Sequence, residues 1–142
     1  MQTMLFHAHS GLRYLVLLAG VIASVVLLLG YLKRRPYKGA SRIASSAFMG
    51  LLHLQFVLGI LLVITGIWYS ALIGHMFMMF LAVGLFTTMA GYAKRQTDDH
   101  KAHGVALAGV VLTLALIAGG ILSIRSGLFA SSGHPSVRSA PR

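Results

Sequence analysis

The stretch of sequence that decides the fold is residues 12–36, which read LRYLVLLAGVIASVVLLLGYLKRRP. Apart from Arg13 it is apolar as far as Leu32, and a helix of roughly 20 such residues crosses the hydrocarbon core of a bilayer. A basic run then ends in Pro36, which cannot continue a helix. The residues before this stretch have no basic cluster of the kind that opens a signal peptide. We therefore expect a retained transmembrane helix rather than a cleaved leader.

The composition of the whole chain agrees with this interpretation. Hydrophobic residues make up 57% of the sequence and charged residues 10%, and the mean hydropathy is +0.83. Such values are typical of integral membrane proteins. Lys and Arg number 12 against two acidic residues, but most of these cations lie in loops and in the C-terminal tail, where they set membrane topology. Nucleic acid is therefore not an expected partner. Because the chain has no cysteine, disulfides, iron–sulfur clusters and covalently attached haem are excluded.

Three further apolar stretches follow the first. We expect transmembrane helices over residues 10–32, 46–69, 75–93 and 104–124. Because the connections are short, the expected fold class is an all-α membrane protein, a four-transmembrane-helix antiparallel up-down-up-down bundle. In this bundle the first helix faces the third across the axis, and the second faces the fourth. Residues 1–125 are expected to form the transmembrane domain and residues 126–142 a polar, flexible tail.

The basic residues between the helices predict the orientation in the membrane. The connection at residues 70–74 has no basic residue, whereas the other two connections and their flanks hold eight. These eight are Lys33, Arg34, Arg35, Lys38, Arg42, Lys94, Arg95 and Lys101. By the positive-inside rule they belong in the cytoplasm, so both termini are expected outside the cytoplasmic (inner) membrane of a bacterium.

Four of the seven histidines lie near the ends of the expected helices, in pairs at matching depth. His9 and His75 are expected at one membrane face, and His53 and His103 at the other. Each pair belongs to helices that face each other diagonally, so the two rings can approach the bundle axis from opposite sides. Histidine is rare in membrane spans because its ring needs a polar partner or a ligand there. Zinc requires four ligands, whereas two axial imidazoles suit haem b, so we expect two haem b groups.

Neighbouring residues leave alternatives for some of these ligands. His7 lies two residues from His9, and His100 lies one turn before His103, so either neighbour competes as the ligand. Arg13 shares a helix face with His9, at a spacing of four residues. Its guanidinium is expected to contact the cofactor by pairing with a haem propionate, or else to act as an interfacial anchor.

Two other metal sites follow from the sequence as alternatives. A surface site would use four residues: Asp98, Asp99, His100 and His103. The two acids are also suited to capping a helix start, which needs no metal. A copper(I) site would use the thioethers of residues 75–79, HMFMM, although methionines in helices also serve packing.

Motifs for catalysis are missing from the sequence. It has no serine or cysteine nucleophile with a base and an orienting acid, no glycine-rich phosphate loop and no acidic pair inside a span. Tyr14, Tyr31, Trp68 and Tyr69 lie near the expected interfaces, where aromatic belts or a quinone pocket would use them. We expect an electron-transfer protein rather than a stand-alone enzyme.

The run HAHSGLRY at residues 7–14, the segment LHLQ at residues 52–55 and His103 carry a resemblance. Together they resemble small four-helix bacterial membrane proteins of the b-type cytochrome kind, with two haems on paired histidines, over residues 7–124. The resemblance implies that His9, His53, His75 and His103 are axial ligands. It also implies transfer of electrons across or within the bilayer to a quinone or redox-protein partner. The alternative function is an accessory or structural subunit of a larger respiratory or photosynthetic membrane complex, whose histidines hold chlorophyll-like pigments or nothing.

Overall fold

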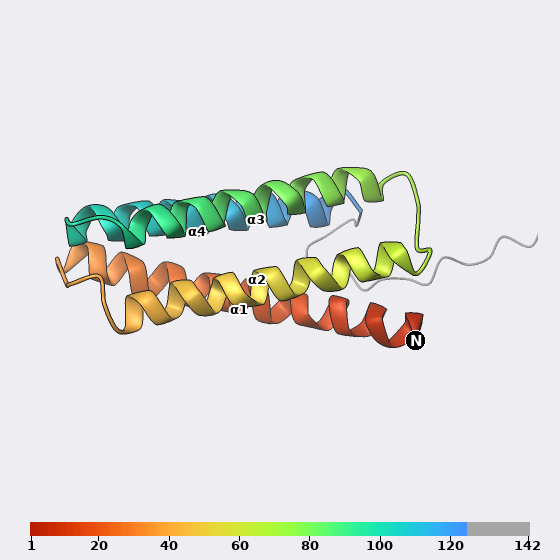
Figure 1. The fold of residues 1–142 in the computed structure, drawn as a ribbon, viewed down its shortest axis with the longest axis horizontal. Coiled ribbons are helices and arrows are strands. Elements are labelled where there is room, and N and C mark those ends of the chain that lie inside the picture. Colours follow the sequence, from red (N-terminus) through yellow and green to blue (C-terminus); the bar gives the residue numbers. More distant parts are fainter. Residues whose placement is uncertain (125–142) are drawn as a thin grey trace, which may run out of the picture.

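The computed structural model describes residues 1–124, which form four long helices packed as one bundle (Figure 1). The helices are α1 (Gln2–Leu32), α2 (Ala40–Ile64), α3 (Leu72–Lys94) and α4 (Asp99–Leu122). Each is long and apolar enough to cross a membrane, so the predicted all-helical membrane bundle is confirmed. The predicted tail at residues 126–142 lies outside the described residues.

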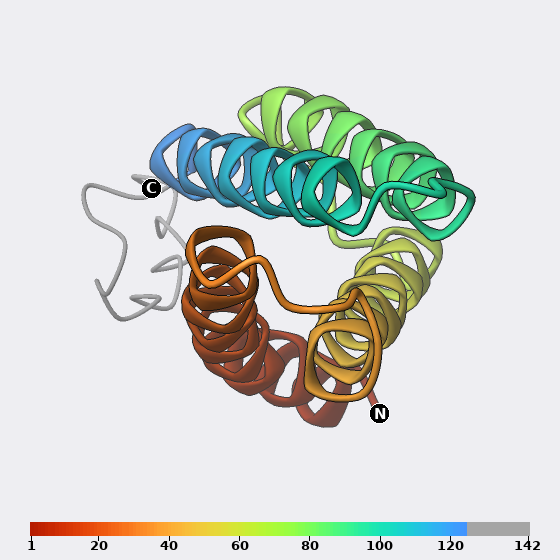
Figure 2. The same ribbon diagram turned by 90° about the vertical axis from the view of Figure 1, so that its left-hand side faces the viewer.

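The connections lie at the two ends of the bundle. Residues 33–39 and 95–98 connect helices at one end, which we call the basic end, and residues 65–71 connect α2 to α3 at the other, which we call the N-terminal end because α1 begins there (Figure 1). The α1–α2 and α3–α4 pairs pack closely, and α1 also packs on α4 (Figure 2). Contacts between α2 and α3 are sparse, and α1 and α3 do not touch. The two helical hairpins are therefore joined mainly along one side.

The helix boundaries differ from those expected. The first helix, α1, begins at Gln2 rather than residue 10, and α2 is displaced at both ends. The α2 helix begins at Ala40 rather than residue 46, directly after Gly39, whose φ of 49° suits glycine. It ends at Ile64 rather than residue 69, because Gly66 follows in a left-handed conformation with φ of 95°. The whole helix is thus displaced along the sequence by about a turn and a half. Every side chain on α2 consequently lies farther from the basic end than expected.

The start of α4 shows the capping that the sequence suggested. Asp98 precedes the helix, and its carboxylate accepts hydrogen bonds from the backbone N–H groups of His100 and Lys101 at 2.9 and 3.4 Å. This N-cap begins the helix five residues before the expected position. The helical segment therefore includes His103 one turn inside α4.

The end of α1 is closed by a Schellman turn. The N–H of Arg35 donates to the carbonyl of Gly30 at 3.0 Å, and the N–H of Arg34 donates to that of Tyr31 at 3.4 Å. Arg34 has φ of 48°, a left-handed position that glycine normally occupies. The turn leads the chain back so that Tyr37 is buried against α4.

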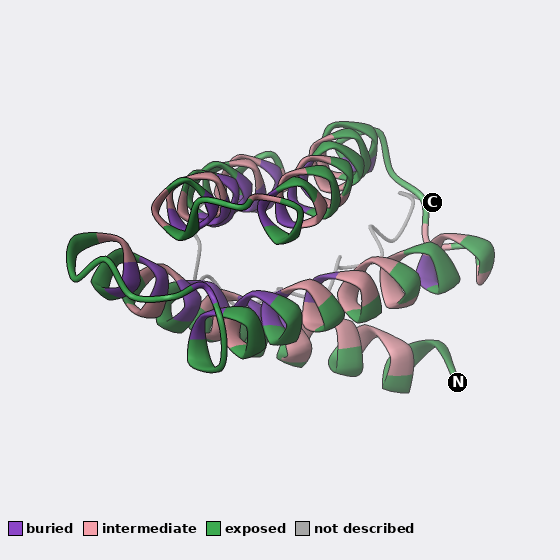
Figure 3. Cartoon of the chain, turned by 60° about the vertical axis from the view of Figure 1, so that its left-hand side comes forward, coloured by how far each residue is buried: buried purple, intermediate pink, exposed green. Residues whose placement is uncertain are grey.

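Buried residues face the inside of the bundle, and the large exposed hydrophobic residues cover its outside (Figure 3). That pattern is expected where lipid, rather than water, surrounds the helices. Phe48 of α2 and Phe86 of α3 meet at the centre with ring centroids 4.8 Å apart. Small residues hold the helices close elsewhere: a Cβ added to Gly20 of α1 would lie 2.6 Å from Leu114 of α4.

Candidate functional site

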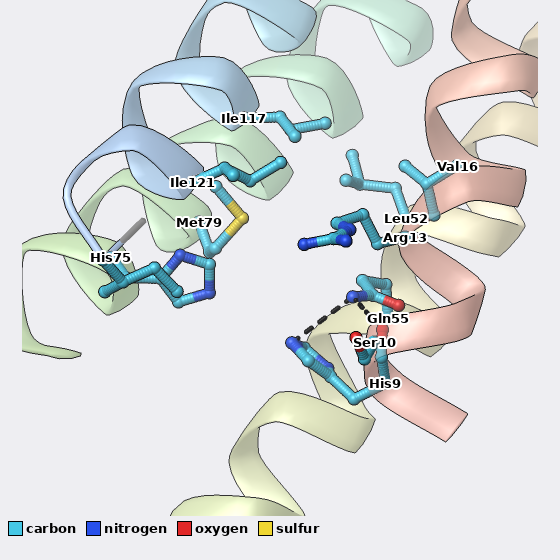
Figure 4. A pocket seen from close by; sticks show the side chains of 11 residues that line it. His9, Ser10, Arg13, Val16, Leu52, Gln55, His75, Met79, Ile117 and Ile121 are labelled. Atoms are coloured by element: carbon cyan, nitrogen blue, oxygen red, sulfur yellow. Dashed lines mark hydrogen bonds between the residues drawn. The ribbon is translucent and has the colours of Figure 1, made fainter. Parts of the chain in front are cut away.

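The structure brings His9 of α1 and His75 of α3 together near the N-terminal end. Their ring centroids lie 6.4 Å apart and the ring planes are nearly perpendicular, at 82°. Both rings line a cavity of about 60 Å³ between the two hairpins (Figure 4). The other lining residues are Ser10, Arg13, Val16, Leu52, Gln55, Met79, Ile117, Ile121 and Ile124.

The separation of the two rings is compatible with a shared metal, and it also lies within the range of edge-to-face ring contacts. A metal bound about 2.0–2.1 Å from each of two opposed imidazole nitrogens, with each ring centroid roughly 1 Å farther back, places the centroids about 6 Å apart. The observed 6.4 Å between His9 and His75 matches this value. Since α1 and α3 do not otherwise touch, the two side chains bridge the diagonal of the bundle.

The ring of His75 is oriented by α4. Its Nδ1 lies 2.9 Å from the carbonyl oxygen of Gly120, and because a carbonyl only accepts, Nδ1 donates the hydrogen bond. The other nitrogen, Nε2, is then the one with a lone pair, as in most metal-binding histidines. Gly120 allows this approach, since an added Cβ would lie 2.6 Å from the methyl group of Met79 and 3.5 Å from His75 Nδ1.

The ring of His9 is supported by α2. The side-chain amide of Gln55 donates to the carbonyl oxygen of His9 at 2.9 Å and to His9 Nε2 at 3.3 Å. One turn farther along α2, an added Cβ at Gly59 would lie 3.1 Å from Cε1 of His9. Sequence analysis did not assign Gln55 to the site. The sequence feature that could have identified Gln55 is its polar amide inside an apolar span, one helical turn before Gly59.

Arg13 places a positive charge in this cavity. The residue is only 7% exposed, one helical turn along α1 from His9, and its side chain extends into the space between His9 and His75 (Figure 4). Its Nη2 donates to the hydroxyl of Tyr14 at 2.6 Å, and the guanidinium lies 4.5 Å from the centre of that ring. Nε is buried and makes no hydrogen bond within residues 1–124. Arg13 therefore lines the same cavity as His9 and His75, with part of its hydrogen-bonding capacity unused.

His7 takes no part in the cavity. It is exposed on α1 and packs edge-on against Phe6, with ring centroids 5.9 Å apart. Of the two histidines in the HAH run, His9 is the one that faces His75.

The structure does not bring His53 and His103 together, so the expectation of a second level pair is corrected. His53 lies 13 residues into α2, about 20 Å from its start, whereas His103 lies four residues into α4, about 6 Å from its start. The difference arises because α2 begins at Ala40, not at residue 46. The ring nitrogens of both residues are hydrogen-bonded to other groups of the protein.

His103 is completely buried at the basic end, with both ring nitrogens bonded. Nδ1 donates to the carbonyl oxygen of Asp99 at 2.8 Å, and Nε2 accepts from the hydroxyl of Ser41 at 2.9 Å. The edge of the Tyr37 ring packs at 5.0 Å between centroids, and an added Cβ at Gly30 would lie 2.2 Å from Nε2. This is the environment of a structural histidine.

His53 is half-buried between α2 and α3. Its Nδ1 donates to the carbonyl oxygen of Met49 at 2.7 Å, and Nε2 accepts from the hydroxyl of Thr87 at 3.2 Å. The Thr87 contact links the two hairpins where α2 and α3 otherwise meet only sparsely.

The other histidine alternative and the surface metal site are also placed by the structure. His100 stacks on Tyr31 with ring centroids 3.9 Å apart, and Asp99 accepts a hydrogen bond from the Tyr37 N–H at 2.8 Å. Among the residues described, no group of three or more His, Cys, Asp or Glu side chains is arranged to hold a metal ion. The four-residue surface site is therefore not assembled.

Comparison with known proteins finds no matching family model, curated protein or solved structure.

Proposed function

We propose that this chain is a membrane b-type cytochrome in which His9 and His75 hold one haem at the N-terminal end of the bundle. The observation that carries the proposal is the pair of opposed imidazoles, 6.4 Å apart, on two helices that do not otherwise touch. In this role the protein passes single electrons within the bilayer to or from a quinone or a redox protein, and it is not a stand-alone enzyme.

The residues around the two histidines suit such a cofactor. Leu52, Ile117 and Ile121 give the cavity apolar walls that exclude water, and His75 is fixed by Gly120 with Nε2 as the coordinating atom. Haem bound by two histidines supplies a one-electron couple between ferric and ferrous iron. If His9 and His75 both held the iron, the group would supply electron transfer rather than oxygen chemistry.

The size of the cavity sets a condition on binding. Its volume of about 60 Å³ is far smaller than that of a porphyrin. A porphyrin therefore requires the side chains that line the cavity to move aside while His9 and His75 keep their separation.

One haem per chain is proposed here instead of the two first expected. His53 and His103 lie at different depths in the bundle, so they do not form a pair. With the basic loops in the cytoplasm of a bacterium, the remaining site lies near the outer face. A single haem near the outer face exchanges electrons with partners at that face or within the plane of the membrane. It does not form a two-haem path across the membrane.

Absorption spectroscopy tests the proposal. The protein is produced in a haem-replete bacterial host, purified in detergent and measured as a reduced-minus-oxidised difference spectrum. We expect the sharp reduced α-band of a bis-histidine haem in the wild type and in His7→Ala, and its loss in His9→Ala. His7 is the matched control because it lies on the same helix two residues away and outside the cavity. Wild-type protein without an α-band, or His9→Ala with an unchanged one, would overturn the proposal.

A further inference from the structure

We infer that this cavity selects a macrocycle with a free carboxylate, and that Arg13 is the residue that pairs with it. A haem with free propionates then binds in preference to an esterified pigment of the chlorophyll type. This inference rests on the proposed function and adds the chemical class of the ligand.

The first observation is a buried guanidinium whose hydrogen bonds are incomplete. Arginine stays charged in proteins, and a charge removed from water is costly unless it is paired. Arg13 is 93% buried, since its exposure is 7%, and its hydrogen-bond partner in the structure is the neutral hydroxyl of Tyr14. Its Nε has no partner within the described part of the chain. Charged residues inside membrane spans normally mark functional sites for this reason.

The second observation is that no acidic side chain of the protein lies near Arg13. The full sequence has two acidic residues, Asp98 and Asp99, and both lie at the basic end. Asp98 caps α4, and Asp99 accepts from the Tyr37 N–H. Gly30 packs against His103 and so marks the basic end on α1. It lies 17 residues after Arg13 on that helix, which places Arg13 about 26 Å from the basic end. A side-chain carboxylate for Arg13 must therefore come from outside this chain.

The third observation is the direction of the side chain. Arg13 extends into the same cavity that His9 and His75 line (Figure 4). A ligand held by the two histidines is therefore within the reach of Arg13. Guanidinium groups bind carboxylates through two parallel, charge-assisted hydrogen bonds, which are stronger than bonds to neutral oxygens.

These observations separate two kinds of macrocycle. Haem b has two propionates that are ionised at neutral pH, whereas chlorophyll-type pigments have the corresponding acid groups esterified and therefore uncharged. An ester cannot neutralise Arg13 and leaves the charge buried and unpaired. A charge-assisted hydrogen bond of the usual strength corresponds to a difference of about 10- to 100-fold in the dissociation constant.

The test compares haemin with its dimethyl ester, which has the same iron and ring but no free carboxylate. Apo-protein in nanodiscs of zwitterionic lipid is titrated with each form, and binding is followed through the bis-histidine Soret band. We expect the wild type to bind haemin about 10- to 100-fold more tightly than the ester. Arg13→Gln should remove this preference by weakening haemin binding alone, and Arg13→Lys should keep part of it. Arg35→Gln, an exposed residue of the basic end, is the matched control and should behave as the wild type.

The outcomes distinguish this inference from the proposed function. Equal affinity of the wild type for both forms, each with a bis-histidine spectrum, would overturn the role of Arg13 and leave the haem site standing. A wild type that gives no bis-histidine spectrum with either form would overturn the proposed function itself. Binding of the ester also reports whether Arg13→Gln is folded, and the wild-type comparison decides the question even if that variant is not.

Discussion

The two ends of the bundle use histidine in opposite ways. At the basic end His103 is fully buried, and both its ring nitrogens have protein partners in Asp99 and Ser41. At the N-terminal end His9 and His75 line a cavity with a buried arginine whose Nε is unbonded. The surroundings of a buried polar group, rather than its residue type, thus separate a structural histidine from a candidate ligand.

Glycines follow the same division. Because Gly30 has no side chain, the backbone of α1 packs directly against the ring of His103. This close packing stabilises the basic end. Gly59 and Gly120 instead lie behind the rings of His9 and His75 and leave the opposite side facing the cavity. The basic end is therefore closely packed, and the N-terminal end contains the cavity of the candidate site.

The largest effect on stability is expected from His103→Ala. Removing the ring leaves a cavity and takes away the hydrogen-bond partner of Ser41, so the free energy of unfolding should fall by about 2–4 kcal/mol. His75→Ala, in a half-buried position beside an existing cavity, should cost the apo-protein about 1 kcal/mol. Denaturant unfolding in detergent, followed by circular dichroism, measures both. Equal losses would remove the distinction between the two ends.

A smaller loss is expected from Gly30→Ala. The new methyl group would lie 2.2 Å from Nε2 of His103, so the ring and its bond to Ser41 must shift, at a cost of about 1–3 kcal/mol. Gly50→Ala on α2 is the matched control, because nothing lies within 4 Å of its added Cβ. That control should be neutral or stabilising by up to about 1 kcal/mol through helix propensity. The same unfolding assay applies, and a harmless Gly30→Ala would contradict the close packing.

At the N-terminal end, Gly59→Ala should affect ligand binding more than stability. Its methyl group would lie 3.1 Å from His9 Cε1, which displaces the ring by a few tenths of an ångström. We expect haem affinity to fall by about tenfold, equivalent to about 1.4 kcal/mol, with less than 1 kcal/mol lost from apo-protein stability. Haem titration of Gly59→Ala beside Gly50→Ala measures the difference. Identical affinities in these two variants would argue against His9 as a ligand.

The smallest effect is expected from Arg34→Gly in the turn after α1. Arg34 holds a left-handed conformation with φ of 48°, which glycine adopts without the steric cost. Because this position is the one where helices commonly end in glycine, the substitution should stabilise the protein by about 0.5–1 kcal/mol. Thermal unfolding of the variant measures the gain, and a clear loss would show that the Arg34 side chain makes a stabilising contact.

The helices of this protein could be predicted from sequence, but not their exact ends. Long apolar stretches such as residues 12–32 leave little choice of fold in a membrane. Residues 40–45 are less apolar, so the start of α2 was expected at residue 46, and His53 consequently received the wrong depth. At the opposite end α1 begins at Gln2 rather than residue 10, so His9 lies inside the helix, yet the structure still brings it to His75.

The details of the candidate site depend on how the helices are rotated about their axes, which hydropathy does not fix. Gln55 and Gly59 acquire their roles because α2 turns this face towards His9, and Gly120 does so because α4 turns its backbone towards His75. Arg13 was predicted because its spacing of four residues from His9 is a property of any helix.

The number of haems per chain in single histidine variants tests the central claim most directly. Protein from a haem-replete host is assayed for haem as the pyridine haemochrome and for chain concentration by amino-acid analysis. We predict one haem per chain in the wild type, in His53→Ala and in the folded fraction of His103→Ala, and none in His9→Ala or His75→Ala. Two haems per chain in the wild type, or haem that survives loss of His75 but not of His53, would contradict the account.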